Sequence, residues 1–448
     1  MILIKNASYL VQNQDEILEN VDILVKDNKI FKIGKDLGLN YPYEKVIDAT
    51  NKIVAPGFIN MHTHLYQNML KGMRDDLGLK DWCENVTFPF AMIIRSQDKE
   101  HNNQDLAYYY GLLGAIEMLK SGITTFVDMD IIYDSLFQSW QDLGVRGIGA
   151  IQAVNRWVPK ELMDTDEKRM EGIKATVEKW HNQGILKVAI APSTPFACTP
   201  DFLEWLKNLS IEKDLGIYIH ISETLWEVEQ SLADCGLTPL AYLDSINFLS
   251  KQICAIHGVH FTEKEMQIAK EKQVTICYNP KSNAKLGSGI APMVEYKKLG
   301  IDICLATDGA ASNDLLDIFE EMRFGVMLQK AKYQDPACFI AEDIYQMATK
   351  AGAKYLDIDA GELKEGKLAD IIILATEEAH FAPVHNIIQQ IVYCGKEKSV
   401  ETVLINGKIV MEDRKIKGVD ESSAVKKAVE LAKQRYGETS RKKLSAEF

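Results

Sequence analysis

The middle of the chain alternates short apolar runs with amphipathic stretches of helical length, and this rhythm limits the fold more than any other feature. Strands that are buried on both faces need continuous apolar runs. Eight runs have this character: Ile53–Asn60, Ile123–Met129, Val145–Ile151, Lys187–Pro192, Gly216–Ile221, Ile253–His257, Val274–Cys277 and Ile301–Ala306. Helical patterns separate them, for example in Asp166–Gln183, Pro200–Asp214 and Thr262–Lys272. This alternation predicts an α/β fold, a (β/α)₈ TIM-type barrel. An open doubly wound sheet is the alternative, but no Gly-x-Gly-x-x-Gly turn follows a strand.

The two ends of the chain have a different texture, with short extended stretches separated by turn residues. The stretches are Val21–Val25 and Ile30–Gly34 near the start, and Ile371–Leu374 and Val400–Val410 near the end. We therefore expect one small β-sandwich domain built from both termini. The predicted division gives residues 1–55 to this domain and residues 56–360 to the barrel. Residues 361–448 then complete the small domain and add a C-terminal helix.

Composition excludes several classes of function. Of the 448 residues, 46% are hydrophobic and 26% are charged, which is typical of a globular protein. A formal charge of −13 would repel a phosphate backbone, so nucleic acid is not an expected partner. There is no basic membrane patch, no run long enough to span a membrane and no signal-peptide pattern at the N-terminus. The eight cysteines form no Cys-x-x-Cys pair, so we expect reduced thiols in a cytoplasmic protein.

Metal-competent side chains stand where four of the predicted strands end. They are His62 and His64, then His220, His257 and Asp308. Barrel enzymes place their reacting groups at this face. His62 and His64 point to the same side of an extended segment, so both imidazoles can reach one ion. Each residue alone has a structural alternative, such as a histidine bonded to backbone or a helix-capping aspartate. Together they predict a metal site.

Four segments resemble the amidohydrolase superfamily. They are Pro56–His64, His220–Thr224, Asn279–Asn283 and Ala306–Asn313. The last three resemble its deaminase and chlorohydrolase branch, which includes methylthioadenosine/S-adenosylhomocysteine deaminases, guanine deaminases and triazine hydrolases. The resemblance spans nearly the whole chain. It is also compatible with a homodimer, for which no residue gives evidence.

The resemblance implies roles for individual residues. His62, His64, His220 and Asp308 would bind one divalent metal ion, with Zn²⁺ expected and Fe²⁺ or Mn²⁺ as alternatives. Binuclear relatives use a carboxylated lysine after the fourth strand, but here that strand ends in Ala191-Pro192-Ser193. We therefore expect a single ion.

Glu223, His257 and Asp308 are the predicted catalytic residues. A bound ion lowers the pKa of water to about 7, and Asp308 can accept the proton that this water releases. Glu223 can move the proton to a ring nitrogen and then to the leaving amine. His257 can donate to the attacking oxygen and orient it. His260 is the alternative to His257, although we favour a structural role for it.

Three residues are predicted to contact substrate: Gln67, Trp82 and Ser193. The amide of Gln67 can pair with a heterocyclic edge, although capping the backbone is an equally good interpretation. Trp82, Phe88 and Phe90 belong to a long insert that precedes a helix beginning near Gln104. These aromatics suit a lid, but they also suit a core.

The chain departs from the methylthioadenosine/S-adenosylhomocysteine deaminases at three places. Ala91 stands where those proteins carry a glutamate for the ribose, and Ser193 where they carry a histidine. Ile151-Gln152 occupy the place of an expected arginine, and Arg146 and Arg156 are offset from it. A site that depends on polar contacts with its substrate works poorly when those contacts are missing. Because this chain lacks the three residues that would contact a nucleoside thioether, the departures favour a compact substrate.

We therefore predict a hydrolytic deaminase that releases ammonia from an amino-substituted purine, pterin, pyrimidine or triazine. The alternatives are a methylthioadenosine/S-adenosylhomocysteine deaminase, a triazine chlorohydrolase or a cyclic amidohydrolase. A non-enzymatic member of the fold is disfavoured because every metal and acid/base position is intact.

Overall fold

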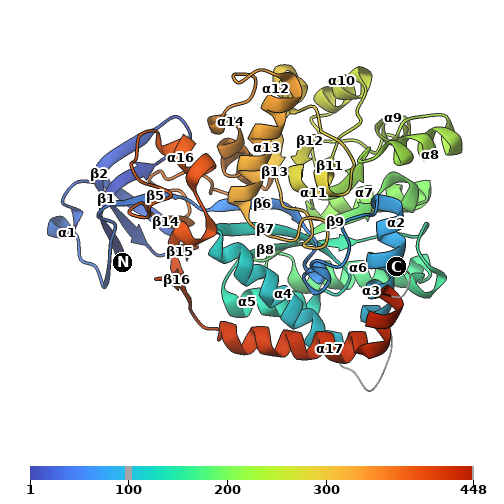
Figure 1. Ribbon diagram of the computed structural model, residues 1–448, viewed down its shortest axis with the longest axis horizontal. Coiled ribbons are helices and arrows are strands. Elements are labelled where there is room, and N and C mark those ends of the chain that lie inside the picture. Colours follow the sequence, from blue (N-terminus) through green and yellow to red (C-terminus); the bar gives the residue numbers. More distant parts are fainter. Residues whose placement is uncertain (96–102, 446–448) are drawn as a thin grey trace.

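The computed structural model describes residues 1–95 and 103–445, and its centre is an eight-stranded parallel sheet rolled into a barrel (Figure 1). The strands follow one another around the barrel in chain order. They are β6 (Phe58–Thr63), β7 (Ile123–Asp130), β8 (Arg146–Gln152), β9 (Lys187–Ser193), β10 (Ile217–Ile221), β11 (Ile253–His257), β12 (Thr275–Tyr278) and β13 (Ile303–Leu305). The predicted (β/α)₈ barrel is confirmed.

Helices connect and cover the strands, as parallel pairing requires. They are α4 (Asn103–Lys120), α5 (Asp134–Leu143), α6 (Asp166–Trp180), α7 (Pro200–Lys213), α8 (Leu225–Cys235), α9 (Pro239–Ser245), α10 (Glu263–Glu271), α11 (Pro280–Lys285), α12 (Met293–Leu299), α13 (Ile318–Tyr333), α14 (Ala341–Met347) and α15 (Lys350–Tyr355). The insert after β6 holds η1 (Leu65–Leu70), α2 (Leu79–Trp82), η2 (Cys83–Thr87) and α3 (Phe88–Arg95).

The apolar runs are buried on both faces, as the sequence predicts. Every residue of β7 is buried, for example. Side chains such as Met61, Val127 and Ala189 fill the barrel interior, and a second, larger cluster packs between the strands and the helices. The barrel is therefore a packed core, and its chemistry is confined to the strand ends and the loops that follow them.

The first apolar run is not one strand. It forms β5 (Lys52–Pro56) in a second sheet and β6 in the barrel, with Gly57 between them. The backbone at Gly57 passes very close to Thr124. A Cβ atom on Gly57 would lie only 2.2 Å from Thr124 Oγ1. Both halves of the run are buried and apolar, so no polar residue in the sequence marks the change of sheet.

Strands from both ends of the chain form a nine-stranded mixed sheet, drawn at the left of Figure 1. Besides β5, its strands are β1 (Ile2–Val11), β2 (Ile17–Lys26), β3 (Lys29–Gly34), β4 (Lys45–Asp48), β14 (Ile371–Ala375), β15 (Val400–Ile405), β16 (Lys408–Glu412) and β17 (Lys415–Ile416). The sheet curls around its own apolar cluster, and Ile30 N donates to Lys367 O at 2.9 Å across the fold. The predicted β unit from both termini is confirmed, while the exact domain boundaries stay a prediction.

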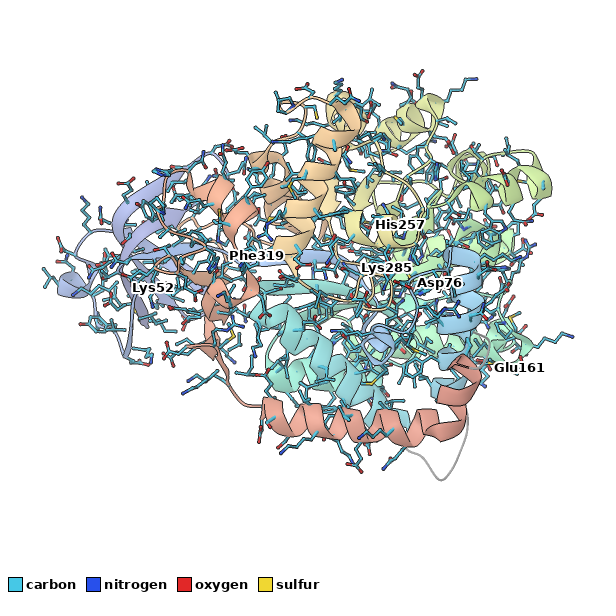
Figure 2. All side chains as sticks on the ribbon, viewed as in Figure 1. Lys52, Asp76, Glu161, His257, Lys285 and Phe319 are labelled. Carbon is cyan, nitrogen blue, oxygen red and sulfur yellow. The ribbon has the colours of Figure 1, made fainter. Side chains whose placement is uncertain are left out.

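A buried ion pair joins the mixed sheet to the barrel. Arg146, the first residue of β8, binds Asp370 at 3.0 Å. Figure 2 shows Lys52 on the mixed sheet and His257 well away from it, within the barrel. Three helices lie outside the barrel repeat: α1 (Leu37–Asn40), α16 (Ile387–Cys394) and α17 (Glu421–Ser445). In Figure 1 α17 runs along the lower edge of the molecule, where it contacts α4. Within residues 1–95 and 103–445, no helix combines the length and apolar character needed to cross a membrane.

Gly57→Ala should destabilise the protein by about 1–3 kcal/mol, because the new methyl group would overlap Thr124. Gly172→Ala in α6 is the matched control, since a Cβ there meets open space and alanine favours a helix. Urea unfolding monitored by circular dichroism gives both values. Equal stability of Gly57→Ala and the wild type would show that the chain has room to move at this junction.

Candidate functional site

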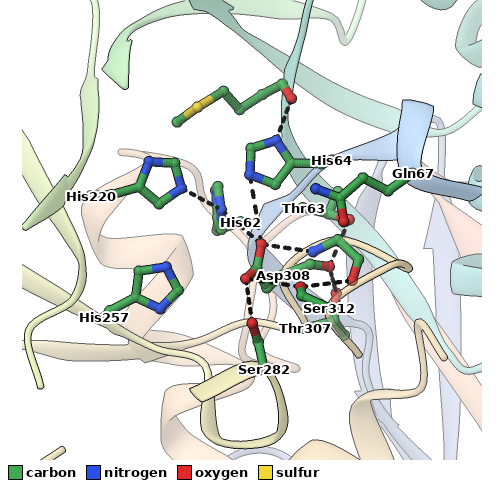
Figure 3. A network of polar contacts seen from close by, with 12 residues as sticks. His62, Thr63, His64, Gln67, His220, His257, Ser282, Thr307, Asp308 and Ser312 are labelled. Carbon is green, nitrogen blue, oxygen red and sulfur yellow. Dashed lines mark hydrogen bonds and ion pairs between the residues drawn. The ribbon is translucent and has the colours of Figure 1, made fainter. Parts of the chain in front are cut away.

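The strand ends bring the predicted metal ligands into one cluster (Figure 3). His62 Nε2 lies 3.2 Å from Asp308 Oδ1 and 3.3 Å from His220 Nε2. His64 Nε2 lies 3.6 Å from the same Asp308 oxygen. The ligand nitrogens of the three histidines all lie within 4.8 Å of one another. Residues far apart in the sequence thus present their donor atoms to one small space.

Backbone carbonyls fix the orientation of two of these rings. His64 Nδ1 bonds to Met129 O at 2.7 Å, and His220 Nδ1 bonds to Ser193 O at 2.8 Å. A carbonyl can only accept, so each Nδ1 carries the proton and each Nε2 turns a lone pair toward the cluster. This arrangement suits metal ligation.

Asp308 is held by donors that the sequence did not assign. Ser282 Oγ donates to Asp308 Oδ2 at 2.6 Å, and Ser312 Oγ donates to it at 3.2 Å. Gly309 N donates to Asp308 Oδ1 at 2.7 Å. Ser282 and Ser312 belong to two of the segments that carry the family resemblance, which was the only signal that could have identified them. Both serines orient the carboxylate.

Burial sets the protonation state of the cluster. Burial lowers the pKa of all four histidines at the strand ends, that of His64 to about 3. Burial alone would raise the pKa of Asp308, but the hydrogen bond from His62 and the surrounding imidazoles hold it well below its ordinary value. The cluster therefore offers neutral imidazoles and one carboxylate, which is the state that metal binding requires.

Glu223 and His257 meet beside this cluster. Glu223 Oε2 lies 3.3 Å from His257 Nε2, and Ser288 Oγ donates to Glu223 Oε1 at 2.9 Å. His257 Nδ1 bonds to Asn283 Oδ1 at 2.8 Å. Burial and the charge of Asp308 raise the pKa of Glu223 to about 8, against the smaller opposite effect of Ser288. A carboxyl group with this pKa can both hold and release a proton near neutral pH.

Four residues at the strand ends adopt left-handed backbone conformations. The φ angles are 55° for Ser193, 52° for Ser222, 74° for His257 and 61° for Asp308. Such a conformation costs on the order of 1–3 kcal/mol in a non-glycine residue and persists only where the surroundings enforce it. These four residues stand at or just after the ends of β9, β10, β11 and β13, next to the cluster.

A cavity of about 130 Å³ opens onto the cluster. His64, His220, Glu223, His257 and Asp308 line its floor, and the rest of the described lining is mainly apolar and aromatic. An apolar cavity of about 150 Å³ holds a single aromatic ring. The site thus matches a small planar molecule.

The insert and neighbouring loops form the wall of the cavity. The predicted contacts Gln67, Trp82 and Ser193 all line it, together with Ala91 and Gln152. Sequence reasoning did not identify Trp157 and Phe196, which also line it. The rings of Trp157 and Phe196 lie 4.9 Å apart, although nearly forty positions separate them in the chain, so no local pattern could pair them.

The geometry supports the structural roles considered for Gln67 and His260. Gln67 Oε1 accepts a hydrogen bond from Ala311 N at 3.1 Å, so its carbonyl caps backbone, and its Nε2 donates to the Tyr66 hydroxyl at 3.5 Å. His260 Nε2 bonds to Ser288 O at 2.7 Å, a structural contact behind Glu223. The roles of Gln67, Trp82 and Ser193 toward substrate stay predictions.

Comparison with known proteins agrees with this geometry. The model of the amidohydrolase family matches residues 53–410. The chain belongs to the amidohydrolase family. This confirms the resemblance inferred from the sequence.

Relatives and solved structures cover nearly the whole chain. A 5-methylthioadenosine/S-adenosylhomocysteine deaminase from Thermoanaerobacter pseudethanolicus is 37% identical over 94% of this chain and 95% of its own. A 5'-deoxyadenosine deaminase from Methanosphaera stadtmanae is 37% identical over 97% of this chain and 98% of its own. The crystal structure of an adenosine deaminase from Xanthomonas campestris with bound zinc has a TM-score of 0.89 at 24% identity, and the match covers 97% of this chain and 98% of that one. At 24% identity, the match to this crystal structure shows the fold alone.

In this amidohydrolase a buried carboxyl on α13 holds the loop that carries Asp308. Asn313 Nδ2 donates to Thr307 O at 2.7 Å and also to Glu321 Oε1. Burial raises the pKa of Glu321 to about 8, although the charge of Lys281 and the hydrogen bond from Asn313 act in the opposite direction. Glu321 is therefore a positioning residue whose protonation affects the stability of the fold.

The wild type should lose stability as pH rises, and Glu321→Gln should lose less of it. Folding raises the pKa of Glu321 from an ordinary value of 4.5 to about 8. This residue's contribution is therefore fully present below pH 4.5 and is lost as pH rises toward 8, by at most about 1.4 kcal/mol per pH unit. Urea unfolding of metal-free protein between pH 5 and pH 8 measures the slope, with the exposed Glu178→Gln as control. A Glu321→Gln slope equal to that of the wild type would contradict this account.

Proposed function

We propose that this amidohydrolase is a metal-dependent hydrolytic deaminase of an amino-substituted heterocycle. The observation that carries the proposal is the contact between Glu223 and His257, 3.3 Å apart, in the small cavity that His64, His220 and Asp308 also line. Deamination needs an activated water and a group that delivers a proton to the amine. The relatives that are named as deaminases over nearly the whole chain support this reaction class.

In this proposal His62, His64, His220 and Asp308 hold one divalent ion, most simply Zn²⁺. Three imidazole nitrogens and one carboxylate oxygen form a donor set that zinc accepts, and a zinc-containing solved structure shares the fold. No lysine lines the described part of the cavity, so the chain offers no bridge for a second ion there. A bound ion supplies the Lewis acidity that makes water nucleophilic near neutral pH.

The protein side chains then divide the proton transfers. Asp308 accepts a proton from the attacking water, while His257, anchored through Nδ1 by Asn283, orients that water with Nε2. Glu223 delivers its proton to the ring nitrogen next to the reacting carbon. The oxygen of water bonds to that carbon, giving a tetrahedral intermediate. The proton taken by Asp308 passes through Glu223 to the amine. As the C–N bond breaks and ammonia leaves, the hydroxyl group formed from water gives its proton to Glu223, which leaves a carbonyl and restores the protonated Glu223.

The lining favours a compact substrate: an aminated purine, pterin, pyrimidine or triazine. Ala91 lines the cavity where a ribose-binding glutamate would be expected, and a methyl group cannot accept hydrogen bonds from sugar hydroxyls. Apart from Glu223 and Asp308, the described lining contains no carboxylate. A 5'-modified adenosine is the second candidate, because relatives named for such substrates are 37% identical to this chain.

His62→Ala should remove one equivalent of metal per chain and nearly all activity while leaving the fold intact. His62 lies at the centre of the cluster, with both Asp308 and His220 within 3.3 Å. Atomic emission analysis of purified wild type and variant gives the difference in metal content. The exposed His385→Ala serves as control and should keep its full metal content. An unchanged metal content in His62→Ala, or a loss of two ions, would refute the mononuclear centre.

Glu223→Gln should keep its metal and lose roughly 10²–10⁴-fold in kcat, which is the usual contribution of a general acid/base. The amide preserves the shape and the contact with Ser288 but cannot carry the proton. Glu229→Gln, an exposed change on α8, is the matched control. A rate near that of the wild type would exclude Glu223 from the chemistry, and loss of metal would make it a ligand.

Ammonia release across a substrate panel tests the proposed function itself. The panel contains aminated purines, pterins, pyrimidines and triazines, with methylthioadenosine, S-adenosylhomocysteine and 5'-deoxyadenosine for comparison. We expect the highest kcat/KM for a free aminated heterocycle. A thioether nucleoside that is better by tenfold or more would replace the compact substrate with the second candidate. Release of chloride or of a ring-opened acid without ammonia would exclude a deaminase.

A further inference from the structure

Three buried cysteines meet inside the barrel, away from the histidine cluster. Cys254 lies on β11, Cys277 on β12 and Cys304 on β13. Their sulfur atoms all lie within 4.8 Å of one another, and Cys254 Sγ and Cys304 Sγ are 4.0 Å apart. From the sequence alone, each cysteine is predicted to be a small apolar core residue. Only the pairing of the strands, in which Cys277 faces Cys304, brings the three thiols together.

The spacing of the three sulfurs suits a thiolate-bound cation. In zinc sites the metal–sulfur distance is about 2.3 Å, which places the sulfurs about 3.8 Å apart around a tetrahedral ion. Cys254 Sγ and Cys304 Sγ are 4.0 Å apart and no pair is more than 4.8 Å apart, so modest side-chain adjustments bring all three sulfurs to bonding distance. The ligands stand on adjacent strands of a rigid sheet, which is a preorganised arrangement.

A buried hydroxyl without a partner lies in the same part of the interior. Tyr218 on β10 is 1% exposed and belongs to the apolar cluster that contains the three cysteines. Its hydroxyl finds no hydrogen-bond partner in the described part of the chain. An unsatisfied buried polar group destabilises the fold, so this oxygen is available to a ligand or to a water bound with it.

A second cavity is lined by residues of the strands that carry the cysteines. It has a volume of about 510 Å³ and lies at the end of the barrel where the strands begin, opposite the proposed active site. Tyr218, Thr275 and Tyr355 belong to its wall, and Thr275 is the register partner of Cys254. The three cysteines are fully buried and are not among its described lining residues, so a cation that enters here must pass this wall to reach them.

We propose that Cys254, Cys277 and Cys304 form a second metal site that takes a thiophilic d¹⁰ cation, Zn²⁺ in the first instance. Thiolates are soft ligands that prefer such ions. Thiols that are protonated before binding release their protons to solvent as the metal–sulfur bonds form. Cys304 lies on β13 and Asp308 lies beyond the end of that strand, and the two proposed sites share no ligand.

Titration with Cd²⁺ of reduced, chelator-treated protein tests this proposal. Cadmium bound to thiolates gives a charge-transfer absorption in the ultraviolet, whereas cadmium bound to histidine and aspartate does not. The wild type should therefore show the thiolate band, and the band should saturate when one Cd²⁺ per chain is bound at this site. Cys277→Ala and Cys304→Ala should each weaken binding there by more than about a hundredfold and leave the binding of Cd²⁺ at the histidine cluster unchanged.

Two control variants separate this site from single thiols. Cys198→Ala removes a buried thiol outside the cluster, and Cys235→Ala removes an exposed one. Both should keep the band and its stoichiometry. Absence of the band in the folded wild type would overturn the proposal without recourse to any variant. Persistence of the band in Cys277→Ala, or its loss in Cys235→Ala, would assign it to adventitious thiols and overturn the proposal equally.

Discussion

Hydrogen bonds between the end of β6 and the segment that follows β13 join the two ends of the barrel sheet. Asn60 makes two of them, since its Nδ2 donates to Thr307 Oγ1 at 2.8 Å and its Oδ1 accepts from Thr307 N at 3.0 Å. Asp308 N donates to His62 O at 3.1 Å, and Thr63 Oγ1 donates to Asp308 O at 3.0 Å. Residues that close the barrel are thus themselves ligands of the proposed metal site or immediate neighbours of them. The same hydrogen bonds therefore close the barrel and position the ligands of the site.

The chemistry of the site follows from the burial that this closure produces. Removing the histidines from water keeps them neutral, and the neighbouring imidazoles keep Asp308 ionised. The same burial raises the pKa of Glu223 to about 8. Two carboxyl groups in one cavity therefore take opposite protonation states near neutral pH. One suits the binding of a cation and the other suits proton delivery, which is the division of roles that hydrolytic deamination needs.

Much of this arrangement could be predicted from the sequence because barrel strands are local and periodic. The count of apolar runs predicted the barrel, and polar residues at the ends of those runs predicted the cluster around His62. Contacts that depend on the packing of distant segments could not be predicted. Ser288 behind Glu223, the pairing of Trp157 with Phe196, and the convergence of three cysteines each join residues from different loops or strands. The switch of sheet at Gly57 was also hidden, because both of its sides are apolar and buried.

A crystal structure of the zinc-loaded protein, with anomalous scattering recorded at the zinc absorption edge, tests the central claim most directly. The account predicts a peak at about 2.0–2.2 Å from nitrogens of His62, His64 and His220 and from a carboxylate oxygen of Asp308, with Glu223 and His257 outside the coordination sphere. A peak ligated by Glu223, or no peak at these strand ends, would contradict it.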